Sequence, residues 1–366
     1  MSDSIFDKLF ELFQSSGPVN WQLGNEVMKS IVGEPDLIEP RVSEEYLDLA
    51  GAAELKIQGT GLLTIVTADL LQPVDRRTWA ELNERSFEWF ILPLAQRMSA
   101  MADGPMAAMM GPLGPALAGM QSGTMVGFMS HRVLGQFDTG LPALGQKNAV
   151  LVIPAIEAFA EEYELDAREV RFWAALRAVA YRSLLAKPGV EDLVRTIVVE
   201  FLESVEFDMS RLTDAAAGAG GAMDLEGLLS GDAGIGQLLG ATYDTAKLKK
   251  VQGLLATIEG FVDVVIADAA DDMLPSLPRI VDAHTLRRSE PGQADDGIGA
   301  MIGLRFDRGL AADAGRLVRE LVENWGVESL DQLWSSAESV PTADELTDSV
   351  GWVARNYLPD IDIDLD

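Results

Sequence analysis

Cysteine is absent from this chain of 366 residues, and histidine occurs only twice, as His131 and His284. Without cysteine there can be no disulfide, no thiolate nucleophile and no cysteine-ligated zinc. A zinc-binding H-E-x-x-H helix needs two histidines four residues apart, so that one helix face offers both to the same ion. The two histidines lie too far apart for that motif. A G-x-S-x-G segment, typical of one class of serine hydrolases, is also absent.

Basic residues are scarce as well. The chain has 28 Lys and Arg against 58 Asp and Glu, a formal net charge of −30, and no basic cluster interrupts this excess. Such a field repels phosphate backbones and anionic lipid, so we expect no nucleic-acid partner. Hydrophobic residues make up 48% of the chain, which indicates a folded globular protein whose partners are basic or neutral.

Features of a secretory or membrane protein are weak. The N-terminus "MSDSIFDKLFELF" lacks the basic start, the apolar run and the cleavage site of a signal peptide. Its apolar residues fall on one side of a short helix, which we expect either to dock on the protein or to anchor a partner. Residues 100–128 are almost uncharged and long enough to span a membrane, but several prolines and glycines would leave backbone groups unpaired in lipid. We therefore expect a packed internal segment, no membrane span and a cytoplasmic protein; a membrane or partner surface is the alternative.

Most of the sequence has the pattern of helices with short connections, which predicts a mainly α fold. "TWAELNERSFEWFILPLAQRM" starts with Thr78 and Glu81 in capping-box spacing and predicts one long helix bent at Pro93. The β-branched run near 148–153, closed by Pro154, is the best candidate for a strand. We expect at most a small β element there.

Two segments are predicted to lie outside the core. Residues 214–240 are rich in Gly and Ala and form either a passive linker or a lid over a neighbouring cleft. The tail 360–366 alternates acidic and apolar residues, which favours a solvated end over a docked edge strand. No internal repeat is apparent. The segments on either side of 214–240 are expected to pack against one another, so residues 1–366 are interpreted as one domain.

Two helical stretches have the pattern of a catalytic site. Asp166 and Glu169 cap a helix that carries "WAALRAVAYRSLL", residues 173–185. Further on, Glu259 and Asp263 stand in E-x-x-x-D spacing, which puts both carboxylates on one helix face. Alone this spacing is weak, because acid pairs four residues apart usually form a solvated surface.

A family resemblance joins these stretches. "GFMSHRVLGQFDTGLP", "VLVIP", "ALRAVAYRSLLAKP", "KVQGLLATIEGFVDVVIAD", "LPSLPRI" and "GVESLDQLWSSAESVPTADEL" follow one another in this order. Together they resemble the zincin-like metallopeptidase type 2 family of actinobacterial proteins. The likeness extends from "GPVNWQL" to "PTADEL", which is nearly the whole chain, and it implies a zincin-like fold.

The resemblance also implies where a site would be. In the zinc-binding branch, the first histidine, the catalytic glutamate and the second histidine fall at Arg177, Ala178 and Tyr181. Another branch has arginine at the first position but keeps the glutamate and the later histidine. Only Glu259, as third zinc ligand, and Asp263, which steadies a ligand from behind, match the family pattern.

The three residues that differ from the family pattern cannot support zinc-dependent hydrolysis. Arg177 has no lone pair for a metal, Ala178 cannot take a proton from water, and Tyr181 is a poor ligand at neutral pH. We therefore expect no zinc and no peptidase activity, and a protein that binds a protein or peptide partner in or near the old cleft. The alternatives are a metal-dependent hydrolase with a non-standard site around Glu259, a structural partner of an active paralogue, or a helix that now serves only the core.

Three expectations concern single side chains. If the fold brings the two helices together, Arg177 should form an ion pair with Glu259 at the vacated zinc position, with a further bond from Tyr181. His131 is expected to be satisfied or at the surface. His284 lies among charges in "DAHTLRRS", which predicts an exposed side chain.

Overall fold

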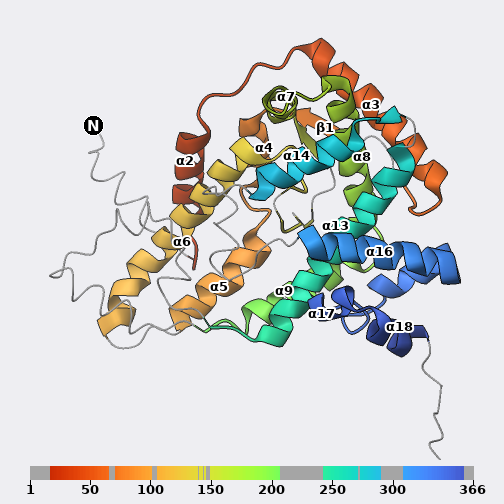
Figure 1. The fold of residues 1–366 in the computed structure, drawn as a ribbon. Helices are drawn as coiled ribbons and strands as arrows, with labels where there is room; N and C mark the ends of the chain where they lie inside the picture. Colours follow the sequence, from red (N-terminus) through yellow and green to blue (C-terminus); the bar gives the residue numbers. More distant parts are fainter. Residues whose placement is uncertain are drawn as a thin grey trace, which may run out of the picture.

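The computed structural model describes residues 17–65, 71–100, 105–138, 140–142, 144–145, 149–206, 242–270, 273–289 and 308–357. The predicted N-terminal helix, the 214–240 segment and the acidic tail 360–366 lie outside these ranges. Within them the chain is mainly α with one two-stranded sheet, as the sequence predicts (Figure 1).

The helices and strands have the following bounds. The helices are α2 Trp21–Val32, α3 Pro40–Thr60, α4 Arg76–Asn83, α5 Glu88–Ala100, α6 Pro105–Arg132, α7 Ile153–Glu162, α8 Ala167–Leu185, α9 Val190–Leu202, α13 Thr245–Ala270, α14 Leu277–Ser289, α16 Arg308–Trp325, α17 Ala343–Thr347 and α18 Val350–Tyr357, with the 3₁₀-helix η3 Val327–Trp334. The strands are β1 Leu71–Val74 and β2 Ala149–Val152.

The sheet confirms the strand predicted near 148–153 and adds one that was not predicted. β1 runs parallel to β2, with Leu71 opposite Ala149 and Val74 opposite Val152. On its other edge β2 meets residues 134–136 of the same chain, where Gly135 forms an antiparallel bridge to Leu151. β1 has only four residues and contains a proline, which occurs in sheets mainly on edge strands. Its sequence therefore gives little indication of a strand.

One predicted helix is two helices, and its cap lies elsewhere. Asp75, not Thr78, is the N-cap of α4, and its carboxylate accepts the Thr78 amide at 2.9 Å. The chain leaves α4 after Asn83, and α5 begins only at Glu88. Asn83 is fully buried and exchanges side-chain hydrogen bonds with Gln136, a partner 53 residues away. The prediction of one long helix was therefore wrong, because a distant contact fixes its end.

Close backbone contact joins α2 to α6. The two helices pack along each other (Figure 1), and glycines form the contact. A Cβ at Gly119 would stand 2.0 Å from the Asn20 carbonyl oxygen, and one at Gly123 would stand 2.0 Å from the Gly24 carbonyl oxygen. Glycine is thus required at both positions by the close approach of backbone. From residue 114 onward the segment is packed internally as predicted, and no helix among the described residues is long and apolar enough to cross a membrane.

Helix α8 is the centre of the core. It packs against α3, α13, α7 and β2, and most of its side chains are buried all round rather than along one stripe. Asp166 caps it as predicted, accepting the amides of Arg168 and Glu169. Because α8 is buried on all sides, its polar residues are buried as well, and they form part of the site.

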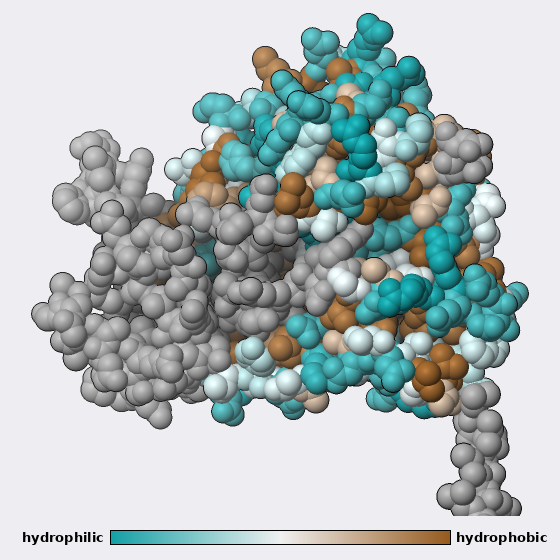
Figure 2. Space-filling model, viewed as in Figure 1, coloured by the Kyte–Doolittle hydropathy of each residue, from teal (hydrophilic) through white to brown (hydrophobic). Residues whose placement is uncertain are grey.

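On the face drawn in Figure 2, hydrophilic side chains cover much of the upper part of the described surface.

Candidate functional site

Two helices bring Arg177 and Glu259 together. α8 and α13 pack against each other, and the Arg177 Nη2 atom donates to both carboxylate oxygens of Glu259, at 2.8 and 3.1 Å. Arg177 is 4% exposed and Glu259 is 3% exposed. The ion pair expected from the sequence is therefore present, and it is buried.

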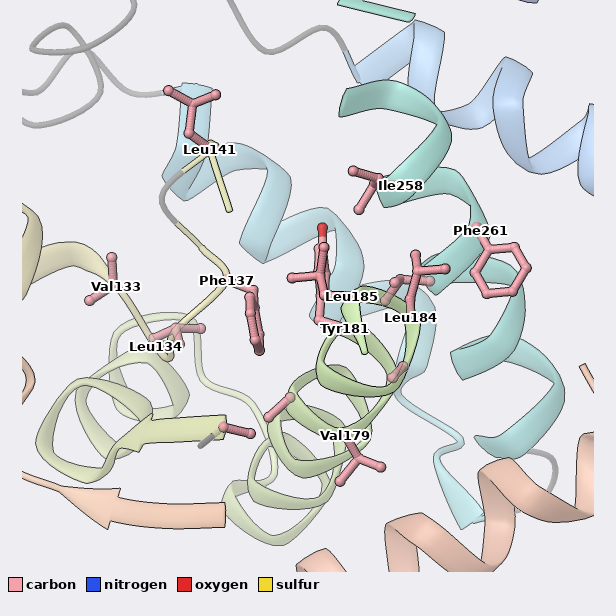
Figure 3. Packing of buried hydrophobic residues seen from close by; sticks show 14 of the residues in the cluster. Val133, Leu134, Phe137, Leu141, Val179, Tyr181, Leu184, Leu185, Ile258 and Phe261 are labelled. Carbon is pink, nitrogen blue, oxygen red and sulfur yellow. The ribbon is translucent and has the colours of Figure 1, made fainter. Parts of the chain in front are cut away.

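Tyr181 adds a second donor to the same carboxylate. Its hydroxyl donates to Glu259, and its ring stacks on Phe137 with 5.2 Å between centroids and 7° between planes. Figure 3 shows the two rings face to face, with Leu184 and Leu185 beside them. The guanidinium carbon of Arg177 lies 4.9 Å from the Tyr181 ring centroid, within range of a cation–π contact. Apolar rings thus shield the charged groups from water.

Asp138 and His284 join the cluster, although the sequence analysis gave neither a role. Arg177 Nε donates to Asp138 Oδ1 at 3.0 Å, and His284 Nε2 lies 3.5 Å from the same oxygen. The prediction that His284 is exposed was wrong: it is 3% exposed and meets the Trp173 ring edge-on at 5.0 Å. The reason is that α14 lies against α8 and turns its His284 face inward. His131 is exposed, with Nε2 3.2 Å from the Ile31 carbonyl oxygen, as expected.

A second arginine reaches Glu259 from α14. Arg288 stands one turn after His284, on the same helix face, and its Nη1 donates to Glu259 Oε1 at 3.2 Å. Asp263 lies farther from the centre, with Oδ1 4.0 Å from Arg177 Nη1 and more of its side chain exposed. Its position one turn beyond Glu259 agrees with the helix face predicted from the E-x-x-x-D spacing.

The charges in this cluster stabilise one another. Burial alone would raise the pKa of Glu259, but Arg177, Arg288 and the Tyr181 hydroxyl outweigh it and lower that pKa to about 2. The pKa of Asp138 is also lowered, since His284 and Arg177 outweigh its burial. Burial and the Glu259 charge raise the pKa of the Tyr181 hydroxyl, which stays protonated and able to donate. At neutral pH the cluster therefore holds ionised carboxylates, guanidinium groups and a neutral phenol.

His284 should make stability depend on pH. Burial lowers its pKa from 6.5 to about 4, and the nearby arginines add to this effect while Asp138 opposes it. Between these two pH values the unfolded chain binds a proton that the folded chain does not, so stability is lost as the pH falls from 6.5 to 4. We expect a loss of about 3 kcal/mol across this range. Urea unfolding at several pH values measures it.

The control is the other histidine. His284→Gln should flatten the dependence between pH 6.5 and 4, whereas the exposed His131→Gln should leave it unchanged. Glu259 contributes mainly at lower pH, because its pKa is lowered from 4.5 to about 2. Equal slopes for wild type and His284→Gln would show that His284 does not cause the effect.

A small cavity lies beside Ala178. It is shallow and partly open to solvent, and Ala178, Arg177 and Asp138 form part of its wall. The rest of the lining is mostly apolar and comes from the 134–138 segment, β2 and α8: Leu134, Gly135, Gln136, Phe137, Leu151, Trp173 and Ala174. Its enclosed space is that of about one water molecule, so a group of a partner would lie over the cavity rather than inside it.

The residues present do not fit a zinc ion. The resemblance implies ligands at positions 177, 181 and 259, but Arg177 offers a guanidinium and directs it at the carboxylate that would bind the metal. The Tyr181 proton is held in a bond to the same carboxylate. Among the described residues, no three His, Asp or Glu side chains are arranged to hold a metal ion. Lone pairs that zinc would need are therefore engaged by the protein's own cations and hydroxyl.

The missed residues had weak signals in the sequence. Asp138 lies inside a quoted family segment, but nothing near it on the chain marks it as charged and buried. His284 and Arg288 are four residues apart, so one face of a helix carries both. That spacing could have placed them together, although only the fold shows which way the face turns.

Comparisons with known proteins identify the family of this chain. A family model described as zincin-like metallopeptidase matches residues 19–353. No curated protein matches. A crystal structure from Chloroflexus aurantiacus, described as a candidate hydrolase with a novel fold, is similar with a TM-score of 0.64 and 20% identity, covering 92% of this chain and 98% of that chain. At this identity the likeness shows the fold alone. The family match spans both helices of the site and most of the sequence, and the chain therefore belongs to the zincin-like metallopeptidase family.

Proposed function

We propose that this protein is a cytoplasmic, non-catalytic member of its family that acts by binding a protein or peptide at or near the altered site. One observation carries the proposal: the Arg177 guanidinium lies on both oxygens of Glu259. A metal ion would have to displace that buried ion pair. The cost is high, because both partners are almost fully buried and separating them would leave a buried charge unpaired.

The loss of a base supports the same proposal. Peptide hydrolysis by a zincin needs a group that takes a proton from the attacking water. Ala178 stands where the resemblance implies that group, and its methyl side chain cannot accept a proton. Glu259 of α13 is a carboxylate of the same site, but both its oxygens already accept hydrogen bonds. The site therefore supports metal-free hydrolysis at Glu259 less well than it supports a non-catalytic role.

The cavity beside Ala178 supports binding. Its lining is mostly apolar, which favours an apolar side chain of a partner docked over its opening. Residues 134–136 already pair with β2 on the edge away from β1, where Gln136 donates to the Val150 carbonyl at 2.9 Å. A partner peptide would thus bind through a side chain docked over the cavity rather than by adding a strand to that edge.

Metal content and activity test the proposal together. Protein purified without chelator should contain far less than one zinc per chain by elemental mass spectrometry, and it should not cleave a mixed peptide library. The reason is that ligands at two positions and the base at a third are missing. Near-equimolar zinc, or a turnover that chelator abolishes and zinc restores, would overturn it. Cleavage that is insensitive to chelator would also overturn the non-catalytic role.

The binding role has its own test. Ala178→Leu should fill the cavity, because leucine adds three carbon atoms to its wall. Peptides selected on the wild type from a displayed library should lose affinity at least tenfold for this variant. Ala312→Leu, at an exposed position of α16, is the matched control and should bind as the wild type does. Equal affinity of all three proteins would place the binding surface elsewhere.

A further inference from the structure

Three carboxylates surround the guanidinium group of Arg177, and two of them are buried. Asp138 follows α6, while Glu259 and Asp263 lie one turn apart on α13. The side chains of Asp138 and Glu259 are 8% and 4% exposed. Ionised carboxylates so deeply buried are unstable unless positive charge compensates them. In a metallopeptidase that charge comes from the metal.

Here two arginines supply it from different helices. Arg177 of α8 is within 4.0 Å of all three carboxylates: 2.8 Å from Glu259, 3.0 Å from Asp138 and 4.0 Å from Asp263. Arg288 of α14 stands 3.2 Å from Glu259. Together the guanidinium groups carry the formal charge of a divalent cation. They also supply directed donors, which suit oxygen atoms spread over a wider space than one small ion can reach.

We propose that Asp138, Glu259 and Asp263 form a cation site whose occupant is the protein's own pair of guanidinium groups, Arg177 and Arg288, in place of a divalent metal ion. The two arginines form the internal cation. The proposal goes beyond the loss of catalysis: it assigns the function of the metal's charge to two residues, one of which, Arg288, lies outside the positions implied by the family resemblance.

If the two arginines replace a metal ion, a metal ion should also be able to replace the two arginines. With both arginines in place, two positive charges meet three negative ones among the described side chains. Without them the same carboxylates sum to −3, with the imidazole of His284 3.5 Å from Asp138. Carboxylates with an imidazole are a ligand set that divalent metals accept. Removing the internal cation should therefore create a demand for an external one.

The test is thermal unfolding of Arg177→Ala/Arg288→Ala with and without Zn²⁺, Mn²⁺ or Mg²⁺. Wild type should melt at the same temperature with any of these ions or with chelator. The double variant should melt lower, and at least one divalent ion should raise its Tm by several degrees, because an ion that binds only the folded state stabilises it. Arg171→Ala, on the same helix but in a half-exposed ion pair, is the control and should not respond. A folded double variant that ignores all three ions would overturn the proposal.

A second comparison applies if the double variant does not fold. Arg177→Lys keeps one positive charge, whereas Arg177→Met keeps most of the volume without charge. If the site needs a cation, the lysine variant should have a smaller unfolding constant than the methionine variant, by about tenfold or more. Adding Glu259→Gln to Arg177→Met should then recover part of the loss, since it removes the unbalanced charge. Equal unfolding constants for Lys and Met would show that Arg177 acts through packing alone and overturn the proposal.

These outcomes are distinct from those that test the proposed function. Zinc bound by the wild-type protein would contradict both proposals. Hydrolysis without a metal would contradict the non-catalytic role but leave the internal cation intact. Variants of Arg177 and Arg288 that behave as packing mutants would remove the internal cation and leave the non-catalytic role unchanged.

Discussion

Replacing Arg177 with alanine is expected to lower the free energy of unfolding by about 3–5 kcal/mol, because the change leaves Glu259 and Asp138 buried without their main counter-charge. Arg177 is 4% exposed, and burial opposes its charge, yet Glu259 and its other neighbours raise its pKa well above the usual value. Its charged form is thus strongly stabilised in the fold. Urea unfolding at pH 7 followed by circular dichroism measures the effect.

Arg171 provides a matched control on the same helix. It pairs with Glu157 at 2.7 Å and Glu45 at 2.8 Å, but its side chain is 20% exposed and those of its partners more so. Water screens such pairs, so Arg171→Ala should cost about 1 kcal/mol or less. If the two variants lose equal stability, burial does not set the strength of the Arg177 interactions, and the account of the site is wrong.

The second large effect is expected at Gly123 of α6. A Cβ there would lie 2.0 Å from the Gly24 carbonyl oxygen, and this neighbour is backbone that cannot rotate away. Gly123→Ala should therefore force α2 and α6 apart and cost at least about 1–3 kcal/mol, as overpacking does in a well-packed core. The loss exceeds any gain from the better helix propensity of alanine. Thermal and urea unfolding of the variant measure the sum.

Gly51 gives the opposite expectation in the same kind of helix. It lies within α3, and a Cβ built there meets nothing within 4 Å. Gly51→Ala should raise the free energy of unfolding by about 0.5–1 kcal/mol, because alanine loses less backbone entropy on helix formation. A Gly123→Ala variant that gains as much as Gly51→Ala would show that α2 and α6 are not in close contact.

The sequence predicts local structure best where local residues determine it. Asp166 and the apolar run after it lead to a capped helix, and β-branched residues closed by Pro154 lead to β2. The break after Asn83 could not be predicted, because its cause is a hydrogen-bonded pair with Gln136 across the fold. β1 was missed since four residues with a proline become a strand only beside β2.

Some residues of the candidate site could be predicted from the sequence and others could not. Glu259 and Arg177 could be paired in advance, because the family resemblance aligns their helices and a buried carboxylate needs a counter-charge. Arg288 and His284 could not, since their role depends on how α14 turns against α8. If α14 were turned the other way, His284 and Arg288 would lie at the surface and would not contact the site. Burial, which decides between these outcomes, is a property of the packed chain and not of the segment.

The two partners of the central ion pair are made at different times during synthesis of the chain. Arg177 and Glu259 are 82 residues apart, and among the acidic partners of Arg177 only Asp138 precedes it. At about 5–20 residues per second, roughly 4–16 s pass between the synthesis of the arginine and that of its main carboxylate. During this interval Asp138 is its only carboxylate partner already made among the described residues, so the charge of Arg177 is only partly compensated. We therefore expect α8 to reach its final buried position after α13 has left the exit tunnel.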